Sequence, residues 1–424
     1  MYWEFGLSIP VIGITGSHGG SISLRLTSST HYKKLVITAV IGWNAVGCST
    51  PGLALEGDVI RPYVSATYLY DDNLRRRSEK ESDTSVIGKA GIIIDKDISL
   101  QNFYAHFGVT ENKYNKNSEL NNTGKEIVAR WNWAMGTKLN GRLEYYKNEA
   151  MLPFADFRGV DLNMRIQERK SFDANWRFHS SWRARYGAQR QDVDYDSSSL
   201  NAASFQEDSH QLGVDYLAES GSKVGLVYTH ARGTRPVDRP AFFPGIGTVF
   251  VNNDYTQQSL KADIRWLYSA KTRLEFLGGY VNRKHDSFSQ RDFSGFNAHA
   301  NGFWSVTDKT SFRAGAWRDA NAISIVTSSY VIDSGASASV SYSATSKVIL
   351  TSSARYQQLK FEGDITGLDQ GRTDKNKVLS LGVTYNPLDS LSFTTSVSRN
   401  LRDSTSQLLN YNSSSISLTG RYEF

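Results

Sequence analysis

One unit repeats along most of this chain: a segment of alternating polar and apolar residues, a short polar turn, a second alternating segment and a longer polar loop. Aromatic residues precede most of the turns, as at Trp133, Tyr216 and Tyr385. The turns fall at 95–97, 135–138, 179–181, 218–222, 269–271, 306–309, 344–347 and 387–390. Short turns on one side, long loops on the other and aromatics at strand ends are typical of a transmembrane β-barrel.

The alternation also gives the number of strands. Between residues 258 and 268 the apolar side chains occupy even positions, whereas Lys261, Asp263 and Arg265 occupy odd ones. Two strands for each of the eight turns, a first strand near 61–71 and a last near 411–424 make about 18 strands, and an even count brings both ends to the periplasmic side. The sequence therefore predicts an all-β, antiparallel, up-and-down barrel of the outer-membrane type.

The longer loops are expected on the outer side. They lie near 72–83, 114–124, 150–158, 197–206, 233–254, 285–291, 321–329, 362–374 and 403–410. The largest, 233–254, contains Pro236, Pro240 and Pro244. It is a candidate for a loop folded over or into the pore, and a solvated surface loop is the alternative.

Composition supports a barrel with a wet interior. Only 39% of the 424 residues are apolar, yet 12% are aromatic, with 34 Gly against 8 Pro. A soluble protein of this size should bury a large aliphatic core, whereas a barrel with a polar lumen needs one apolar residue in two. After residue 60 no stretch reaches the roughly 18 apolar residues of a membrane helix, so strands must cross the bilayer.

The N-terminal segment resembles a secretion signal. Basic residues at 31–34 precede an apolar run at 35–46, and Gly52 and Ala54 are small residues at the −3 and −1 positions of a cleavage site before Leu55. Residues 1–54 are therefore expected to be removed, leaving residues 55–424 as a single barrel. The long stretch before the basic residues is most simply explained by a misassigned upstream start codon.

Cys48 leaves one alternative open for this segment. Residues 45–48 could form a lipoprotein signal with a lipidated Cys48, although the Leu usual three residues earlier is missing. On the first interpretation the mature chain has no thiol and no disulfide. It then has 45 basic and 41 acidic residues, a balance too mild for nucleic-acid binding.

One face of the predicted strands carries many basic residues and fewer acidic ones. Because the Arg fork binds two oxygens at once, an Arg-rich lumen would favour anionic solutes, and the candidate substrate track is Arg142, Arg165, Arg177, Arg183, Arg185, Arg265 and Arg273. The alternative is a set of transverse Arg–carboxylate ladders that keep the lumen solvated. The full basic set is Arg130, Arg142, Arg165, Arg169, Arg177, Arg183, Arg185, Lys261, Arg265, Arg273, Arg283, Arg313 and Arg355, opposed by Glu144, Asp161, Asp173, Asp215, Asp263 and Glu275.

Two lumen aromatics, Tyr146 and Trp317, could offer apolar faces to sugar rings or merely fill space. No catalytic motif is present: there is no Gly-x-Ser-x-Gly, no His-Glu-x-x-His and no phosphate-cradling Gly loop. The eight His show no ligand spacing. We expect no enzyme activity, no metal and no cofactor.

The chain ends on Tyr422-Glu423-Phe424. A terminal aromatic that closes an alternating strand resembles the signal by which outer-membrane barrels are recognised for assembly. Tyr422 and Phe424 are therefore candidate contacts for the outer-membrane assembly machinery. The alternative is that a last strand simply ends on an apolar residue.

A short N-terminal pattern carries a family resemblance. Residues 57–66, followed by Tyr70-Asp71-Asp72-Asn73-Leu74, resemble the start of the exosortase-associated exopolysaccharide export barrels (EpsL-like), within the broader β-barrel porin class. The chain differs from that pattern at 75–77, where three Arg replace the usual Phe. The resemblance implies a polysaccharide cargo and coupling to periplasmic and inner-membrane synthesis and export machinery.

These observations leave three functions open. The favoured hypothesis is an outer-membrane channel that exports an exopolysaccharide, anionic if the arginines form a track. The alternative is a general or anion-selective uptake porin with a narrower eyelet made by an inward-folded loop. The third is a surface adhesin or structural barrel with a plugged lumen. All three place the chain in the bacterial outer membrane, in contact with the lipid bilayer.

Overall fold

A computed structural model describes residues 59–156, 162–243, 247–287, 289–322, 330–364 and 371–424. The proposed signal sequence, with Cys48, Ala54 and Leu55, lies outside the described residues, as does Asp161.

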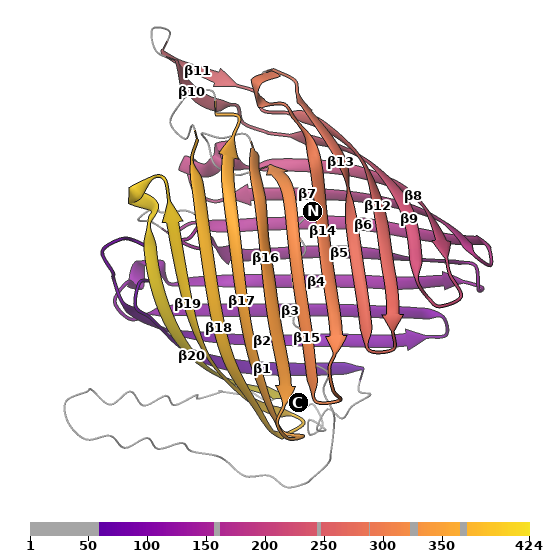
Figure 1. The fold of residues 1–424 in the computed structure, drawn as a ribbon. Helices are drawn as coiled ribbons and strands as arrows, with labels where there is room; N and C mark the ends of the chain where they lie inside the picture. Colours follow the sequence, from indigo (N-terminus) through magenta and orange to yellow (C-terminus); the bar gives the residue numbers. More distant parts are fainter. Residues whose placement is uncertain (1–58, 157–161, 244–246, 288, 323–329, 365–370) are drawn as a thin grey trace, which may run out of the picture.

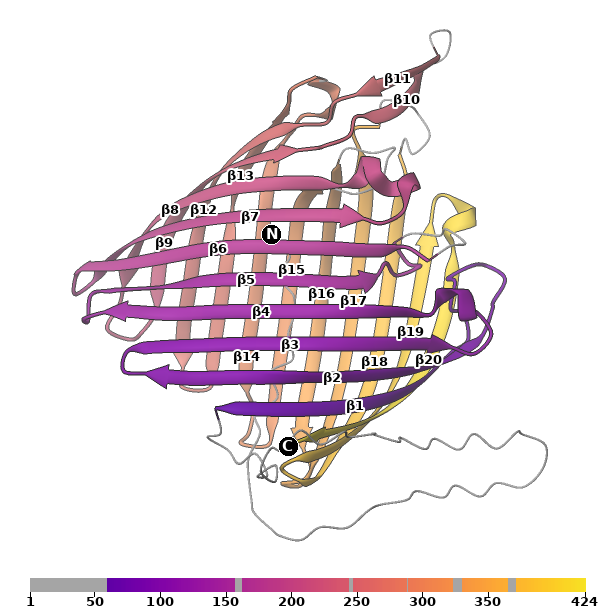
Figure 2. The same ribbon diagram turned by 180° about the vertical axis from the view of Figure 1, so that it is seen from behind.

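Eighteen antiparallel strands form one closed sheet, in which each strand pairs with its neighbours in the chain and β1 pairs with β20 (Figures 1 and 2). The strands are β1 (Ile60–Asp71), β2 (Asp83–Ile98), β3 (Gln101–Tyr114), β4 (Asn122–Met135), β5 (Leu139–Met151), β6 (Met164–His179), β7 (Trp182–Tyr195), β8 (Phe205–Leu217), β9 (Lys223–Thr234), β12 (Tyr255–Ser269), β13 (Thr272–His285), β14 (Phe293–Ser305), β15 (Thr310–Ala322), β16 (Tyr330–Ser343), β17 (Val348–Glu362), β18 (Thr373–Leu388), β19 (Leu391–Ser404) and β20 (Tyr411–Glu423). The predicted fold class and strand number are confirmed.

Shorter elements lie in the loops. A separate hairpin, β10 (Arg239–Phe243) and β11 (Gly247–Val251), rises from the rim between β9 and β12 (Figure 1). The 3-10 helices are η1 (Ser118–Leu120), η2 (Ser198–Ala203), η3 (Ser289–Arg291) and η4 (Gln407–Leu409). No helix in the described ranges is long and apolar enough to span a membrane.

One predicted turn and one predicted loop boundary are wrong. Residues 95–97 belong to β2, and the chain turns at Ser99 and Leu100 instead. Asp95 and Asp97 resemble turn residues because they are polar, but both accept hydrogen bonds from the Asn102 side chain on β3. The loop placed at 150–158 extends to residue 163, where β6 begins.

Side chains alternate between an apolar outer face and a polar inner face. Outward residues such as Leu212 and Leu260 are 59% and 56% exposed, which suits contact with lipid rather than a protein core. Aromatics predicted beside the short turns, including Tyr268 and Trp304, are exposed on this outer face. A second group lies nearer the long loops: Tyr68, Tyr70, Tyr280, Phe296 and Tyr356. Two aromatic girdles therefore flank an apolar belt.

Candidate functional site

Half of the lumen is lined by charged pairs, on strands β4 to β9, β12 and β13, here called the charged wall. At its centre Asp215 has a fully buried side chain and accepts hydrogen bonds from Arg183 Nε and Nη2 at 2.9 and 2.6 Å and from Arg185 Nη2 at 2.7 Å. The β7–β8 register places Arg183 opposite Asp215, and Gly225 lies opposite Asp215 on β9. A Cβ at Gly225 would lie 2.1 Å from Asp215 Oδ1, so the glycine makes room for this carboxylate.

Further pairs continue around the charged wall. Asp263 contacts Arg185 at 2.8 Å and Lys223 at 2.7 Å. Arg273 lies 3.0 Å from Glu275. Glu144 is likewise paired, with Arg130 at 2.8 Å and Arg169 at 3.1 Å. Three candidate track residues are therefore paired with carboxylates, as the ladder alternative predicts: Arg183, Arg185 and Arg273.

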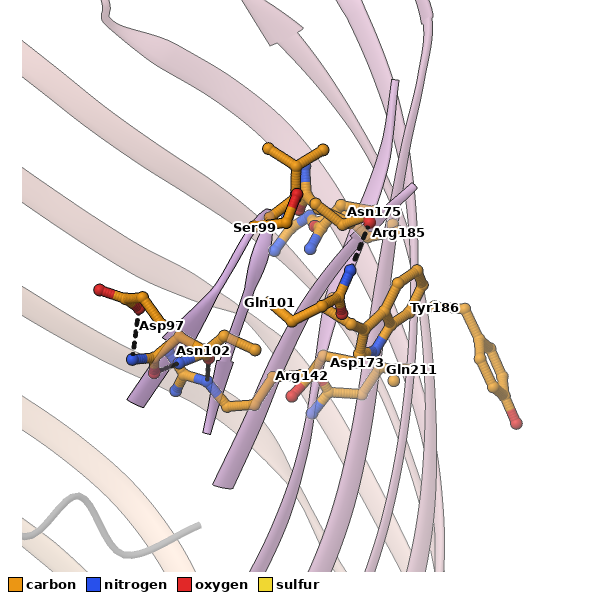
Figure 3. Close-up of a pocket in the computed structure, with 18 of the residues that line it drawn as sticks. Asp97, Ser99, Gln101, Asn102, Arg142, Asp173, Asn175, Arg185, Tyr186 and Gln211 are labelled. Atoms are coloured by element: carbon orange, nitrogen blue, oxygen red, sulfur yellow. Dashed lines mark hydrogen bonds between the residues drawn. The ribbon is translucent and has the colours of Figure 1, made fainter. Parts of the chain in front are cut away.

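The other four track candidates are Arg142, Arg165, Arg177 and Arg265. Within the described part of the chain, no carboxylate lies within ion-pair distance of any of them. Arg142 donates from Nε to Asn132 Oδ1 at 3.0 Å. It also lines a cavity of about 610 Å³ on the lumen side, together with Asp173 and Arg185. The Tyr186 side chain points away from this cavity (Figure 3). These four arginines remain a predicted track.

The opposite part of the lumen is lined mainly by hydroxyl groups, with fewer charges between them. This hydroxyl wall is formed by the lumen-facing residues of β16 to β20. Side-chain hydroxyls pair across strands at Ser396 and Ser417 (2.7 Å), and at Ser398 and Ser415 (2.8 Å). Its members include Ser337, Ser339, Ser341, Thr351, Ser353, Ser380, Thr384, Thr394, Ser396, Ser398, Ser413, Ser415, Ser417 and Thr419. The alternating Ser and Thr were visible in the sequence, but strand neighbours were needed to show that they form one surface.

The lumen aromatics do not present open faces to a solute. Arg169 lies over the Tyr146 ring at 5.2 Å, and Arg355 lies over the Trp317 ring at 4.3 Å. A Cβ at Gly335 would lie 2.4 Å from the Trp317 ring, so the indole rests against a strand position that has no side chain. The arginine over each ring fits the alternative that Tyr146 and Trp317 fill space.

The loop between β5 and β6 folds inward at the mouth. Leu152 packs in one apolar cluster with Val193 and Tyr195, which face the lumen on β7. Farther along, the Ala155 carbonyl accepts a hydrogen bond from Arg402 Nη1 at 2.7 Å. Arg402 is 9% exposed and faces the lumen on β19. The described part of this loop therefore spans from β5 to a wall residue six strands away around the barrel.

The loop predicted to enter the pore, 233–254, behaves differently in its described part. It pairs with itself as the β10–β11 hairpin, and Arg235 N donates to Asp254 Oδ1 at 2.7 Å, which closes the base of this excursion. Pairing between β10 and β11 satisfies backbone N–H and C=O groups that would otherwise need hydrogen-bond partners inside the pore. Burial lowers the pKa of Arg235 to about 10, so it remains protonated at neutral pH.

The motif at 70–74 is a structural connection at the mouth. Asp71 accepts hydrogen bonds from both Arg76 Nη atoms at 2.8 Å. Asn73 is fully buried, and its Nδ2 donates to the carbonyls of Arg77 and Asn412. The motif therefore joins the first loop to the start of β20.

The barrel closes at the C-terminus. Phe424 N donates to the Pro62 carbonyl at 2.9 Å, and the rings of Tyr422 and Phe424 meet edge to face at 4.9 Å. Their role as an assembly signal remains a prediction. The described residues contain no cluster of His, Cys, Asp or Glu that could hold a metal ion.

Comparison with known proteins extends this description. Residues 248–424 match the family model described as "Putative beta-barrel porin 2". No curated protein matches the chain.

Three solved structures illustrate the similarity of the fold. Pseudomonas aeruginosa OpdK, solved with vanillate, shares 12% identity over 86% of this chain and 99% of that chain, with a TM-score of 0.46. Pseudomonas aeruginosa OpdQ shares 10% over 86% and 98%, with a TM-score of 0.47. Acinetobacter baumannii OccAB3 shares 10% over 86% and 99%, with a TM-score of 0.44. These similarities concern the barrel architecture alone.

The closed ladder, the apolar belt and the porin-family match together define the class. The chain is a porin-like β-barrel channel of the bacterial outer membrane.

Proposed function

We propose that this barrel is a diffusion channel for small hydrophilic solutes, with its mouth narrowed by the inward-folded segment 152–156, the described first part of the loop after β5. The observation that carries this proposal is the hydrogen bond between Arg402 Nη1 and the Ala155 carbonyl. It ties the loop to the far wall. Phe154 also lies under the Arg75 guanidinium at 5.5 Å, so the first loop holds the same segment. An inward-folded loop of this kind is the feature expected of an uptake porin.

The two walls favour solutes that form hydrogen bonds. On the charged wall Asp215, Asp263 and Glu144 pair with the arginines that they contact, Arg130, Arg169, Arg183 and Arg185. Paired charges keep a lumen solvated without strongly favouring one sign of solute. The hydroxyl wall offers donors and acceptors with no charge. Polyhydroxylated molecules match both surfaces.

Export of an exopolysaccharide is the second candidate. The hydroxyl wall supports it, because side-chain hydroxyls follow β19 and β20 along most of their length and could contact successive sugar units. The resemblance at 57–74 supports it as well. On this proposal the partners would be the polysaccharide and the synthesis and export machinery, and the four arginines without a carboxylate partner would favour an anionic polymer.

Reconstitution of the folded chain in planar bilayers tests the first proposal. The double variant Arg402→Ala with Phe154→Ala removes both contacts that hold the loop. We expect a larger single-channel conductance, and faster entry of oligosaccharides in liposome swelling. Arg399→Ala is the control, because Arg399 is exposed on the outer face of the same strand.

Two results would overturn the proposal. A wild-type barrel that does not conduct is not an open diffusion channel. A double variant with unchanged conductance and unchanged size exclusion would show that this loop does not narrow the pore. Wild-type passage of long oligosaccharides would favour the export alternative.

A further inference from the structure

Arg355 is an unusual cation of the lumen. It is exposed on the inner face of β17, beside Ser337 on β16 and Val378 on β18. Across the ranges that the structure describes, no carboxylate lies within ion-pair distance of its guanidinium. The group therefore carries its charge on a wall that is otherwise rich in hydroxyls.

Trp317 holds this guanidinium in a fixed plane. The Arg355 Cζ lies 4.3 Å from the centre of the indole ring, a stacking geometry that favours Arg. The indole is itself fixed, because Trp317 Nε1 donates to Asp333 Oδ1 at 2.8 Å and the ring rests near Gly335. Stacking leaves the edge of the guanidinium, which carries its N–H donors, available to the lumen.

The nearby carboxylate is already occupied. Asp333 accepts from Trp317 Nε1 through one oxygen and from Gln357 Nε2 through the other, both at 2.8 Å. It orients the indole and does not form an ion pair with Arg355. The charge of Arg355 thus remains available to a solute.

Three other lumen arginines stack closely on aromatic rings, but each differs from Arg355 in one respect. Arg273 lies 4.2 Å from the Phe303 ring but pairs with Glu275 at 3.0 Å. Arg421 lies 3.9 Å from the Tyr63 ring but pairs with Glu423 at 2.6 Å. Arg283 lies 4.3 Å from the Tyr255 ring but is only 3% exposed. Arg355 combines close stacking, exposure and the lack of a carboxylate partner.

We propose that Arg355 binds the carboxylate of a hydroxylated acid, such as a uronic acid unit, as it passes along the hydroxyl wall. A planar guanidinium held by Trp317 can donate hydrogen bonds to both carboxylate oxygens at once. Ser337 and Ser353 face the same lumen surface and offer hydroxyl partners to the sugar ring. The inference names a solute class for the proposed channel and rests on that proposal.

Current blockade in planar bilayers tests the site. The probes are galacturonate and galactose. Galacturonate carries a carboxylate where galactose carries a hydroxymethyl group. For the wild type we expect galacturonate to interrupt the current at lower concentration than galactose. Arg355→Gln should weaken the galacturonate effect about tenfold, the loss expected for a hydrogen bond to a charged group, and leave galactose unchanged.

Two variants separate charge from geometry. Arg355→Lys keeps the charge but loses the planar fork, so it should retain the ion selectivity of the wild type while losing most of the galacturonate blockade. Arg273→Gln is the matched control, because it removes a stacked arginine that Glu275 already neutralises. It should weaken the galacturonate response much less than Arg355→Gln does.

The outcomes separate the two proposals. If the barrel conducts but Arg355→Gln responds to galacturonate as the wild type does, the Arg355 site is refuted and the channel proposal stands. If the barrel does not conduct, the channel proposal fails, and calorimetric titration of galacturonate into the detergent-solubilised barrel tests the site alone. Binding that is weaker in Arg355→Gln supports the site, and equal or undetectable binding in both proteins refutes it.

Discussion

The charged wall and the hydroxyl wall solve the same problem in different ways. Both must keep polar backbone and side chains wetted inside a barrel whose outer face is apolar. On the charged wall Asp215 is wholly buried between Arg183 and Arg185. On the hydroxyl wall Ser398 and Ser415 share a single neutral hydrogen bond at 2.8 Å. One wall is held by strong, mutually dependent contacts, and the other by weak contacts that water can replace.

This difference separates stability from selectivity. When one partner of a buried ion pair is removed, the remaining carboxylate or guanidinium is left as an uncompensated charge. A hydroxyl that loses its partner can turn to water in the lumen. The charged wall should therefore be the sensitive half of the barrel, because its buried carboxylates and the arginines that contact them depend on one another.

The largest expected effect is that of Asp215→Ala. It leaves Arg183 without a carboxylate and removes one of the two partners of Arg185. Breaking a buried pair costs about 3–5 kcal/mol, and because the arginines are about one quarter exposed we expect about 2–4 kcal/mol. Urea unfolding in detergent micelles, followed by tryptophan fluorescence, measures this loss.

Glu275→Gln provides the matched comparison on the same wall. The side chains of Arg273 and Glu275 are 44% and 37% exposed, so removal of this pair should cost less than about 1 kcal/mol. Equal losses for Asp215→Ala and Glu275→Gln would show that burial does not distinguish the pairs.

Ion selectivity gives the next largest effect and distinguishes a ladder from a track. Asp215→Asn should raise the ratio of anion to cation permeability, and Arg183→Gln should lower it. The double variant should return to the wild-type ratio, because it removes one charge of each sign. Reversal potentials in a salt gradient measure these ratios. If the double variant is as cation-shifted as Arg183→Gln alone, Arg183 acts on the solute and Asp215 does not neutralise it.

The sequence predicted the barrel well because a period of two is a local property. Eight short turns, nine long loops and the inner face of residues such as Arg183 and Asp263 all follow from alternation within single strands. Pairing between strands depends on register, which the sequence does not reveal directly. Only the alignment of β7 with β8 shows that Asp215 contacts two arginines. Likewise, only the alignment of β15 with β16 shows that Gly335 leaves room for Trp317.

The sequence also did not reveal which long loop folds into the mouth of the barrel. The Pro-rich 233–254 segment was predicted either to fold over or into the pore or to form a surface loop, and its described part forms a hairpin at the rim (Figure 1). The segment 152–156 carries no comparable signal, because its inward fold depends on Arg402, nearly 250 residues away in the chain. Of the seven predicted track arginines, the structure pairs Arg183, Arg185 and Arg273 with carboxylates, and among the residues that it describes the other four have no such partner.

A smaller effect is expected where the two walls meet, at the loop after β1. Burial raises the pKa of Asp72, but hydrogen bonds from Lys80 and from the Ser414 backbone N–H outweigh it and hold the pKa below the usual 3.8. A depressed carboxyl pKa stabilises the folded state above the ordinary value, and this contribution is lost as pH falls through the lower folded value. Loosening of this loop should therefore begin below pH 3.8.

Limited proteolysis with pepsin between pH 4 and pH 2 measures that loosening. Cleavage near 72–82 should rise across this range in the wild type. In Asp72→Asn the loop should be cleaved already at pH 4 and change little on further acidification. A wild type and a variant with the same pH profile would show that Asp72 does not hold the loop.

The smallest effect is expected from the hydroxyl wall, and it gives the sharpest test of the comparison. Ser398→Ala removes one partner of a neutral hydrogen bond, and the orphaned Ser415 hydroxyl is only partly buried, so lumen water can satisfy it. A typical bond of this kind contributes about 1 kcal/mol. We therefore expect each single variant, and the double variant Ser398→Ala with Ser415→Ala, to lose about 1 kcal/mol or less in the same urea unfolding. Ion selectivity should not move, because no charge is removed. A coupling energy between the two serines close to that of Arg183 and Asp215 would mean that the hydroxyl wall is held as tightly as the charged wall, and the division between a stabilising half and a solute-facing half would no longer stand.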